Sequence, residues 1–485
     1  MNSNIKKRLF SAAAAFVIFT QCVFAAPSPS PSPSVSPSPS PSVSPSPSPS
    51  PASASAPSAS AKPKAEEPGN SEQDNKKEEF PEPHCEAAIL TDRKTGEVLY
   101  SKNKDEKMYP ASTTKIMTAI LALEKGNLAD NVTVTQEAIS TITNQHSHMG
   151  LKAGETFTLE QLLYGLLVYS ANDAANVIGE HIAGSIDAFV AMMNDKAGEL
   201  GLSGTHYVNT HGFHDDNHYT TAQDLATLTR YAMQNDKFCE IVKTGLYRIP
   251  ANDIYTQERV LSSTNHLISR YRNTKYFYKY AVGVKTGHTD EAGSCLVSAA
   301  TKKDAELIAV VLKADPSTDG TLYAFADSAK MFEYVFNNYK YCKIASEGEV
   351  VSDSAVYEAK NGTRVALSPK ETIEKLLPSD VNTEEINAEI TTIEKIKAPI
   401  AKGDILGSVT YTYMGKELGK TDLVAGNAVE RDYVLAVIHT IINIIKNPLF
   451  IIAAIVLIFL IISSNSRRKK RRQKRRSKMK YSNYK

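Results

Sequence analysis

The sequence predicts an α+β fold in which an antiparallel sheet is interrupted by an inserted helical region. Residues 85–101 alternate apolar and polar side chains around a glycine-containing turn at 92–96, which is typical of a β-hairpin. Helical periodicity then takes over from residue 112. Strand patterns return at 281–286, 294–301 and 306–312. Strands on both sides of a helical stretch favour one sheet that is built from the first and last strands and covered by helices.

The helical region divides into four amphipathic segments, and a fifth helix follows the last strand of the sheet. Apolar residues recur every three or four positions at 112–123, 159–169, 185–200, 221–234 and 322–338. After about Ser346 the pattern changes to short strands separated by glycine-containing turns. We therefore expect a larger domain at 85–345 and a small β-rich domain at 346–430.

The N-terminus has the layout of a secretory signal followed by a spacer. Lys6, Lys7 and Arg8 precede an apolar run and small residues, so 1–25 are predicted to be a signal peptide. A retained membrane anchor is the alternative, although the run is short for a bilayer span. The next stretch is rich in proline and serine and then in charge. Because this composition buries too little apolar surface to fold, 26–84 are predicted to be a disordered spacer.

The C-terminus carries two apolar segments and a basic tail. Apolar residues at 432–447 oppose a polar stripe of Asp432, His439, Asn443 and Lys446. This spacing predicts an amphipathic helix at a membrane interface. Residues 448–464 are a predicted transmembrane helix, and 465–485 a basic cytoplasmic tail, since basic residues stay on the inner side. A nucleic-acid-binding tail is the alternative. We expect a cell-membrane protein whose larger domain is extracellular.

The charge distribution argues against nucleic acid as the partner. The formal charge is +2, but three basic residues near the N-terminus and twelve in the last 20 leave −13 for the middle. An acidic middle lacks the electrostatic footprint of a nucleic-acid-binding domain.

Four scattered cysteines remain after the predicted signal, namely Cys85, Cys239, Cys295 and Cys342. Their scatter favours buried thiols over disulfides, although an exported chain could form them.

The tetrad Ser112-x-x-Lys115 is a candidate nucleophile with its base. Residues three apart on a helix lie on one face, so the two side chains are neighbours. Lys115 begins an apolar stripe, and we expect its ammonium to be buried. Burial penalises the charged form, which lowers the pKa of a lysine, and a neutral amine can activate a serine hydroxyl. A simple helix cap beside a surface lysine is the alternative interpretation.

Two further motifs lie downstream of this tetrad. Ser170-x-Asn172 falls at a junction between two predicted helices, where simple capping is the alternative. Lys285-Thr286-Gly287 lies on a predicted strand, where glycine allows a ligand backbone to approach closely. In this order, the three motifs resemble the active-site signature of penicillin-binding proteins and serine β-lactamases.

The flanking sequence is more specific than the motifs. Residues 285–293, 209–213, 218–226 and 264–267 resemble the D-alanyl-D-alanine carboxypeptidases among the low-molecular-mass penicillin-binding proteins. The segment 414–425 resembles their second domain less specifically, and the resemblance extends from about Cys85 to Lys446. It implies a β-lactamase/transpeptidase-like catalytic domain at 85–345. The proline-rich spacer and the transmembrane segment depart from the family's usual single amphipathic anchor.

The resemblance implies a role for each site residue. Ser112 would attack the penultimate D-Ala carbonyl of a peptidoglycan stem peptide, Lys115 would take its proton, and Ser170 would relay a proton to the leaving D-Ala. The implied substrate-binding residues are Asn172, Lys285, Thr286, Gly287 and His288. Lys285 and Thr286 would hold the terminal carboxylate, and the backbone N–H groups of Ser112 and His288 would form the oxyanion hole. β-Lactam antibiotics should acylate Ser112. No cofactor and no metal are implied.

Three other functions compete with this interpretation. A class A β-lactamase shares the motifs but needs a deacylating glutamate in a Glu-x-x-Leu-Asn-like loop, and Glu199 has no such context. A zinc hydrolase could use the histidine-rich segment, although no His-Glu-x-x-His accompanies it; the candidate ligands are His206, His211, His214 and His218 with Asp215 and Asp216. A non-catalytic wall-binding protein would keep the fold without turnover, and the intact lysines of both motifs argue against it.

Overall fold

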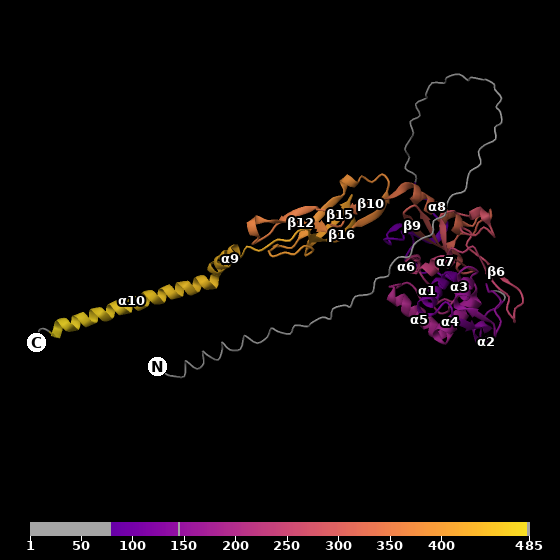
Figure 1. Ribbon diagram of the computed structural model, residues 1–485, viewed down its shortest axis with the longest axis horizontal. Helices are drawn as coiled ribbons and strands as arrows, with labels where there is room; N and C mark the ends of the chain where they lie inside the picture. Colours follow the sequence, from indigo (N-terminus) through magenta and orange to yellow (C-terminus); the bar gives the residue numbers. More distant parts are fainter. Residues whose placement is uncertain (1–78, 144–145, 483–485) are drawn as a thin grey trace, which may run out of the picture. The chain divides into compact units, whose positions relative to one another are not determined.

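The structure of the chain, a computed structural model, describes residues 79–143 and 146–482, with side chains described as far as Arg476. The predicted signal peptide at 1–25 lies outside the described residues, as does the predicted spacer except for residues 79–84. Within the described part, the chain forms two main groups of strands, each with a five-stranded sheet, and two C-terminal helices follow them (Figure 1).

The first group of strands is a five-stranded antiparallel sheet in the order β2-β1-β9-β8-β7. Its strands are β1 Cys85–Asp92, β2 Val98–Lys102, β7 Ala281–Thr289, β8 Gly293–Lys302 and β9 Ala305–Ala314. Strand β1 pairs with β9 from a position more than 200 residues away, with Ile89 opposite Val310. The prediction that the first and last strands share one sheet around an inserted helical region is therefore confirmed.

The inserted region between β2 and β7 is mostly helical. Its helices are η1 Ala111–Thr114, α1 Lys115–Lys125, α2 Gln136–Ser140, α3 Leu159–Leu167, α4 Asn172–Ala183, α5 Ile186–Glu199, α6 Ala222–Ala232, α7 Asp236–Val242 and η2 Thr274–Tyr276. Two short antiparallel strand pairs lie among them, β3 Asn131–Thr133 with β4 Thr156–Thr158 and β5 Leu246–Ile249 with β6 Arg259–Ser262. Helix α8 Tyr323–Asn338 follows the last strand of the sheet.

Both faces of the sheet are buried because successive strand residues point to opposite sides. Ile89 and Val310 belong to the core that contains the inserted helices. Their neighbours in sequence, Leu90 and Ala309, belong to the core on the other face, together with Phe332 of α8. The sheet is thus a middle layer between helices, and the ends of its strands are rigidly placed.

A second antiparallel sheet and a separate pair of antiparallel strands form the β-rich part of the chain. The sheet order is β11-β12-β16-β15-β14, and β10 pairs with β13. The strands are β10 Tyr339–Ala345, β11 Ser352–Ala355, β12 Arg364–Pro369, β13 Ile373–Pro378, β14 Asn387–Thr392, β15 Ile405–Tyr413 and β16 Lys416–Ala425, with the short helices η3 Lys360–Gly362 and η4 Thr383–Glu385. Val365, Leu367, Val409 and Leu423 are fully buried in its own core.

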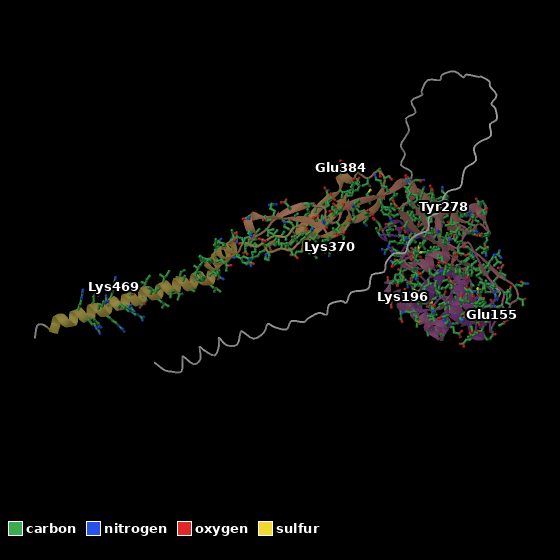
Figure 2. All side chains as sticks on the ribbon, in the orientation of Figure 1. Glu155, Lys196, Tyr278, Lys370, Glu384 and Lys469 are labelled. Atoms are coloured by element: carbon green, nitrogen blue, oxygen red, sulfur yellow. The ribbon has the colours of Figure 1, made fainter. Side chains whose placement is uncertain are left out.

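Two helices complete the chain. Helix α9 Tyr433–Lys446 leaves most of its apolar side chains exposed, and α10 Pro448–Ser482 begins directly after it. Residues Pro448–Arg476 of α10 are long and apolar enough to cross a membrane, with a mean hydropathy of 2.5 over the most apolar window. Basic side chains, Lys469 among them, project from its far end (Figure 2). The four cysteines beyond the predicted signal are all free thiols.

Replacing Phe332 with alanine should destabilise the larger domain. The ring is fully buried between α8 and the sheet, so its loss leaves a cavity and costs about 3–5 kcal/mol of unfolding free energy. Chemical denaturation followed by circular dichroism measures this cost. Tyr271→Ala, at a residue 63% exposed, is the control and should shift the transition little. Equal shifts for both variants would contradict the assigned core.

Candidate active site

Ser112 and Lys115 meet at the start of α1. Ser112 lies in the 3-10 turn η1, and the α-helix begins at Lys115. Lys115 Nζ lies 2.8 Å from Ser112 Oγ, as the three-residue spacing predicts. Ile116, Ala119 and Ile120 of the same helix are buried in the core. Because the helix enters the core from its first turn, the Lys115 side chain is fully buried, as expected from the apolar stripe.

Three oxygen atoms surround the Lys115 nitrogen. Besides Ser112 Oγ, Nζ donates to Asn172 Oδ1 at 2.7 Å and to the main-chain carbonyl of His211 at 2.8 Å. Burial, and secondly the positive charge of Lys285, hold the pKa of Lys115 well below 10.5, while the carboxylate of Asp173 opposes the shift. The site therefore favours an uncharged amine in contact with the serine hydroxyl.

Ser170 and Lys285 form a second hydroxyl and amine pair. Ser170 lies in the short connection between α3 and α4, in a left-handed conformation with φ of +68°. Lys285 Nζ donates to Ser170 Oγ at 2.9 Å and to the Thr286 carbonyl at 2.8 Å. Lys285 is 1% exposed, and burial lowers its pKa to about 7. Its ammonium thus lies behind Ser170 and not on the open surface of the cleft.

The remaining predicted residues follow along β7. The Thr286 hydroxyl lies 2.6 Å from that of Thr264, which fixes its orientation. Gly287 is buried, whereas His288 is exposed, and His288 Nδ1 lies 3.5 Å from Ser294 Oγ. Successive residues of a strand face opposite sides of the sheet, which explains why Gly287 is buried and the next residue, His288, is exposed.

Two glycines allow separate segments to approach the serine turn. A Cβ at Gly287 would lie 2.9 Å from the Pro110 carbonyl oxygen and 3.0 Å from the Ser112 nitrogen. A Cβ at Gly212, whose φ is +84°, would lie 1.8 Å from the Ala111 carbonyl oxygen. Neither distance leaves room for a side chain. Glycine at both positions is what brings β7 and the histidine-rich segment against Ser112.

Sequence reasoning missed several groups that hold the site together. The His211 carbonyl is a partner of Lys115, but a main-chain acceptor leaves no signal in a sequence. Asp173 accepts from the Met149 and Leu151 N–H groups, and the Ser147 carbonyl accepts from the Asn172 N–H at 2.7 Å. The segment that contains Ser147 has no periodic pattern that would place it beside the site. The position of Asp173, directly after Asn172, is the only sequence signal for these contacts.

Ser112 lines an open cleft of about 620 Å³, whereas Ser170, Lys285 and Thr286 are not among the lining residues. The lining residues are Ser112, His146, Ser147, Asn172, Gly212, Phe213, His214, His288, Thr289, Asp290 and Glu291. The structure thus brings Ser112, Asn172 and His288 to the cleft wall, with Lys115 directly behind them. The cleft is large enough for a peptide or a small bicyclic ligand.

The histidine-rich segment frames this cleft, and its imidazoles face different partners. His218 Nε2 contacts Thr114 Oγ1 at 2.8 Å, His206 Nδ1 contacts the Asn217 carbonyl at 2.7 Å, and His211 Nδ1 accepts from the Phe213 N–H. Across residues 79–143 and 146–482, no three His, Cys, Asp or Glu side chains are grouped to hold a metal ion. Glu199 ends α5, near Lys196, and does not line the cleft.

Replacing Lys285 with glutamine should move the pH dependence of Ser112 reactivity. The charge of Lys285 lowers the pKa of Lys115, so its removal raises that pKa. Since the neutral amine is the predicted base, we expect reactivity to fall as pH falls through the Lys115 pKa, and this limb should shift to higher pH. Acylation by a fluorescent penicillin measures the profile. An unchanged or lower midpoint would contradict the coupling of the two lysines.

Replacing Gly287 with valine should disable the site without unfolding the chain. The new side chain would push β7, which carries the predicted oxyanion donor of His288, away from Pro110 and Ser112, and loss of one such donor lowers rates by roughly 10²–10³-fold. Gly419→Ala is the matched control, because its Cβ would meet only the side chain of Ile373. Fluorescent penicillin labelling at normal rates in the Gly287 variant would refute the close approach.

Comparison with known proteins agrees with this geometry. Residues 74–316 match the peptidase S11 family, described as D-alanyl-D-alanine carboxypeptidase, and residues 339–431 match the family described as penicillin-binding protein 5, C-terminal domain. D-alanyl-D-alanine carboxypeptidase DacF of Bacillus subtilis is 32% identical over 360 residues, covering 73% of this chain and 88% of the relative. DacC of Escherichia coli is 30% identical over 371 residues, covering 73% and 86%.

A solved structure extends the likeness to the fold. Penicillin-binding protein 5 from Haemophilus influenzae superposes with a TM-score of 0.60 at 27% identity, covering 72% of this chain and 99% of that chain. The predicted β-lactamase/transpeptidase-like fold with a β-rich second domain is therefore confirmed. The chain belongs to the D-alanyl-D-alanine carboxypeptidases, the serine hydrolases among the low-molecular-mass penicillin-binding proteins.

Proposed function

We propose that this carboxypeptidase removes the terminal D-alanine of peptidoglycan stem peptides through an acyl-enzyme on Ser112. The observation that carries the assignment is the buried Lys115 amine, which can donate to Asn172 Oδ1 and the His211 carbonyl and accept from the Ser112 hydroxyl, 2.8 Å away. A lysine whose pKa is lowered by burial can act as a base at neutral pH, where an ordinary lysine is charged.

In the acylation step, Ser112 Oγ forms a bond to the penultimate D-Ala carbonyl carbon, and its proton passes to Lys115. The N–H groups of Ser112 and His288 stabilise the oxyanion that develops, which typically contributes a few kcal/mol. The C–N bond to the terminal D-Ala then breaks, and Ser170 delivers a proton to the leaving amine. That proton is the one that Lys115 took from Ser112, so Lys115 is again an uncharged amine when the D-Ala leaves, and the Lys285 ammonium, 2.9 Å from Ser170 Oγ, holds the relaying hydroxyl in place.

The terminal carboxylate lies at the β7 side of the cleft in this proposal. The Thr286 hydroxyl donates to it, and the positive charge of Lys285 attracts it from behind. This differs from the direct contact with Lys285 expected from the sequence, because Lys285 is 1% exposed and donates to Ser170. Asn172, held by its contact with Lys115, lies in the cleft wall to receive the substrate amide.

In the second half of the cycle, water attacks the acyl-enzyme carbonyl and gives a proton to Lys115, which returns it to Ser112 Oγ as the ester C–O bond breaks. β-Lactams acylate the same serine, because their strained amide presents a carbonyl and a carboxylate at the matching positions. Hydrolysis of the β-lactam acyl-enzyme is slow in this proposal, because a class A β-lactamase uses a deacylating glutamate in a Glu-x-x-Leu-Asn-like loop. The glutamate in the described cleft lining is Glu291, which lies near His288 and not in such a loop.

The chain ends determine where this chemistry takes place. We infer that the signal directs the enzyme out of the cytoplasm, that α10 crosses the membrane, and that the basic stretch after it stays in the cytoplasm. The catalytic domain then faces the peptidoglycan outside the cell.

Purified protein should release free D-alanine from a stem pentapeptide, and Ser112→Ala should abolish release. Removing the nucleophile or its base lowers the rate by about 10⁴-fold or more, because the two groups act as a unit. A brief exposure to penicillin followed by peptide mass spectrometry should place the adduct on the peptide that contains Ser112, and Lys115→Ala should prevent it.

Three results would contradict the proposal. An adduct on another peptide would reassign the nucleophile, rapid and sustained penicillin turnover would favour a β-lactamase, and loss of activity in chelator would favour a metal hydrolase. Ser263→Ala is a useful control, because its hydroxyl is buried outside the cleft lining.

A further inference from the structure

Glu358 is a buried carboxylate at the point where the β-rich domain meets α9. Its side chain is 3% exposed, and its backbone is left-handed with φ of +60°, a conformation that is costly for glutamate. Neither the catalytic mechanism nor the core of the β-rich sheet requires a carboxylate here. The contacts of Glu358 must therefore explain why a strained and buried carboxylate occupies this position.

Basic groups from two segments converge on this carboxylate. Arg431 donates through Nε at 2.8 Å, and its Nη2 lies 2.6 Å from the same oxygen. Lys397 Nζ lies 3.2 Å from the other oxygen, and His439 Nδ1, on α9, lies 4.0 Å from it. Burial opposes ionisation of Glu358, but the hydrogen bonds from Arg431 and Lys397 outweigh it and lower the pKa.

The main chain reinforces the same junction. The Glu358 carbonyl accepts from the Asp432 N–H at 2.8 Å, and Asp432 caps α9 by accepting from the N–H groups of Val434 and Leu435. The neighbouring Tyr357 stacks on the His439 ring with 4.4 Å between centroids. The N-terminus of helix α9 is therefore hydrogen-bonded to Glu358, and one side of the helix packs against the residues around it.

The contacts on α9 occupy one face of the helix. Asp432, Ala436 and His439 are spaced as i, i+4 and i+7, and Ala436 is only 5% exposed. The polar stripe that the sequence predicted thus begins as a protein contact and not as a water-facing surface. The apolar side chains of α9 remain 39–71% exposed, namely Val434, Leu435, Val437, Ile438, Ile441, Ile442, Ile444 and Ile445.

A lipid interface is the partner that fits this exposed apolar surface. The surface continues directly into α10, whose apolar segment is long enough to cross a membrane. An amphipathic helix next to a span lies with its apolar side at the boundary between headgroups and acyl chains. The opposite side of α9 is the one that contacts Tyr357 and Glu358.

We propose that Glu358 locks the β-rich domain to α9, so that this end of the domain sits directly on the bilayer and does not swing on a free linker. The inference rests on the proposed membrane attachment. A fixed junction would give the catalytic domain a defined position relative to the membrane, which a flexible connection of the same length would not.

Fluorescence quenching in vesicles tests the lock, because the chain contains no tryptophan. Two versions of the full chain each carry one tryptophan reporter. One is Tyr433→Trp on α9, and the other is Lys395→Trp on the β-rich domain next to Tyr357. Vesicles of phosphatidylcholine and phosphatidylglycerol carry a spin label on the headgroup. We expect quenching of both reporters in the parent chain, and loss of quenching only for the Lys395 reporter when Glu358→Gln is added.

Matched variants separate the lock from folding effects. Glu430→Gln removes a neighbouring exposed pair with Lys360 and should leave both reporters quenched. Ala436→Arg leaves the domain intact but places a bulky side chain between α9 and the domain, and it should act like Glu358→Gln. D-alanine release from a soluble peptide should be unchanged in all three.

Each result separates one claim from the others. Quenching of the Lys395 reporter that survives both Glu358→Gln and Ala436→Arg would overturn the lock. An unquenched Tyr433 reporter in the parent chain would overturn the lipid interface on which it rests. Failure to release D-alanine would bear on the catalytic proposal alone, since the quenching readout does not depend on turnover.

Discussion

The burial of one lysine amine is the constraint on which the active site depends. Helix α1 enters the core from its first turn, so Lys115 is carried inside with the apolar residues that follow it. A charged ammonium is costly there, whereas an uncharged amine satisfied by Ser112, Asn172 and the His211 carbonyl is not. In the proposed mechanism, this uncharged amine is the base that takes the Ser112 proton at neutral pH.

The sheet determines what surrounds this amine. Strand β7 reaches Ser112 from more than 160 residues away, and its position is fixed because the sheet is buried on both faces. Gly287 and Gly212 permit the close contacts, and Lys285 adds a second buried amine that disfavours protonation of the first. Two hydroxyl and amine pairs, Ser112 with Lys115 and Ser170 with Lys285, are thus held in fixed contact by buried elements of the fold, which suits proton transfer with little reorganisation.

Much of this arrangement could be predicted from sequence, because its signals are local. Hydrophobic periodicity gave the order of strands and helices, and the spacing of Ser112 and Lys115 gave their contact. Partners that act through the main chain, such as the His211 carbonyl, could not be predicted, since any residue type offers one. The contact of Lys285 with Ser170 depends on tertiary packing between a strand and a helix junction. Likewise, the stripe containing Asp432 and His439 indicated an amphipathic helix, but only the fold reveals Glu358 beneath it.

The state of Lys115 in the resting enzyme is the central claim, and its titration tests that claim most directly. NMR of the protein labelled with ¹⁵N at its lysine side chains gives the pKa of Lys115 without reference to activity. The Lys115 signal is identified by its absence in Lys115→Arg. The account predicts a pKa well below 10.5, because burial and Lys285 both oppose the charged form. A Lys115 that titrates at 10.5 or above would contradict it, since the amine would then be charged at neutral pH and unable to accept the Ser112 proton.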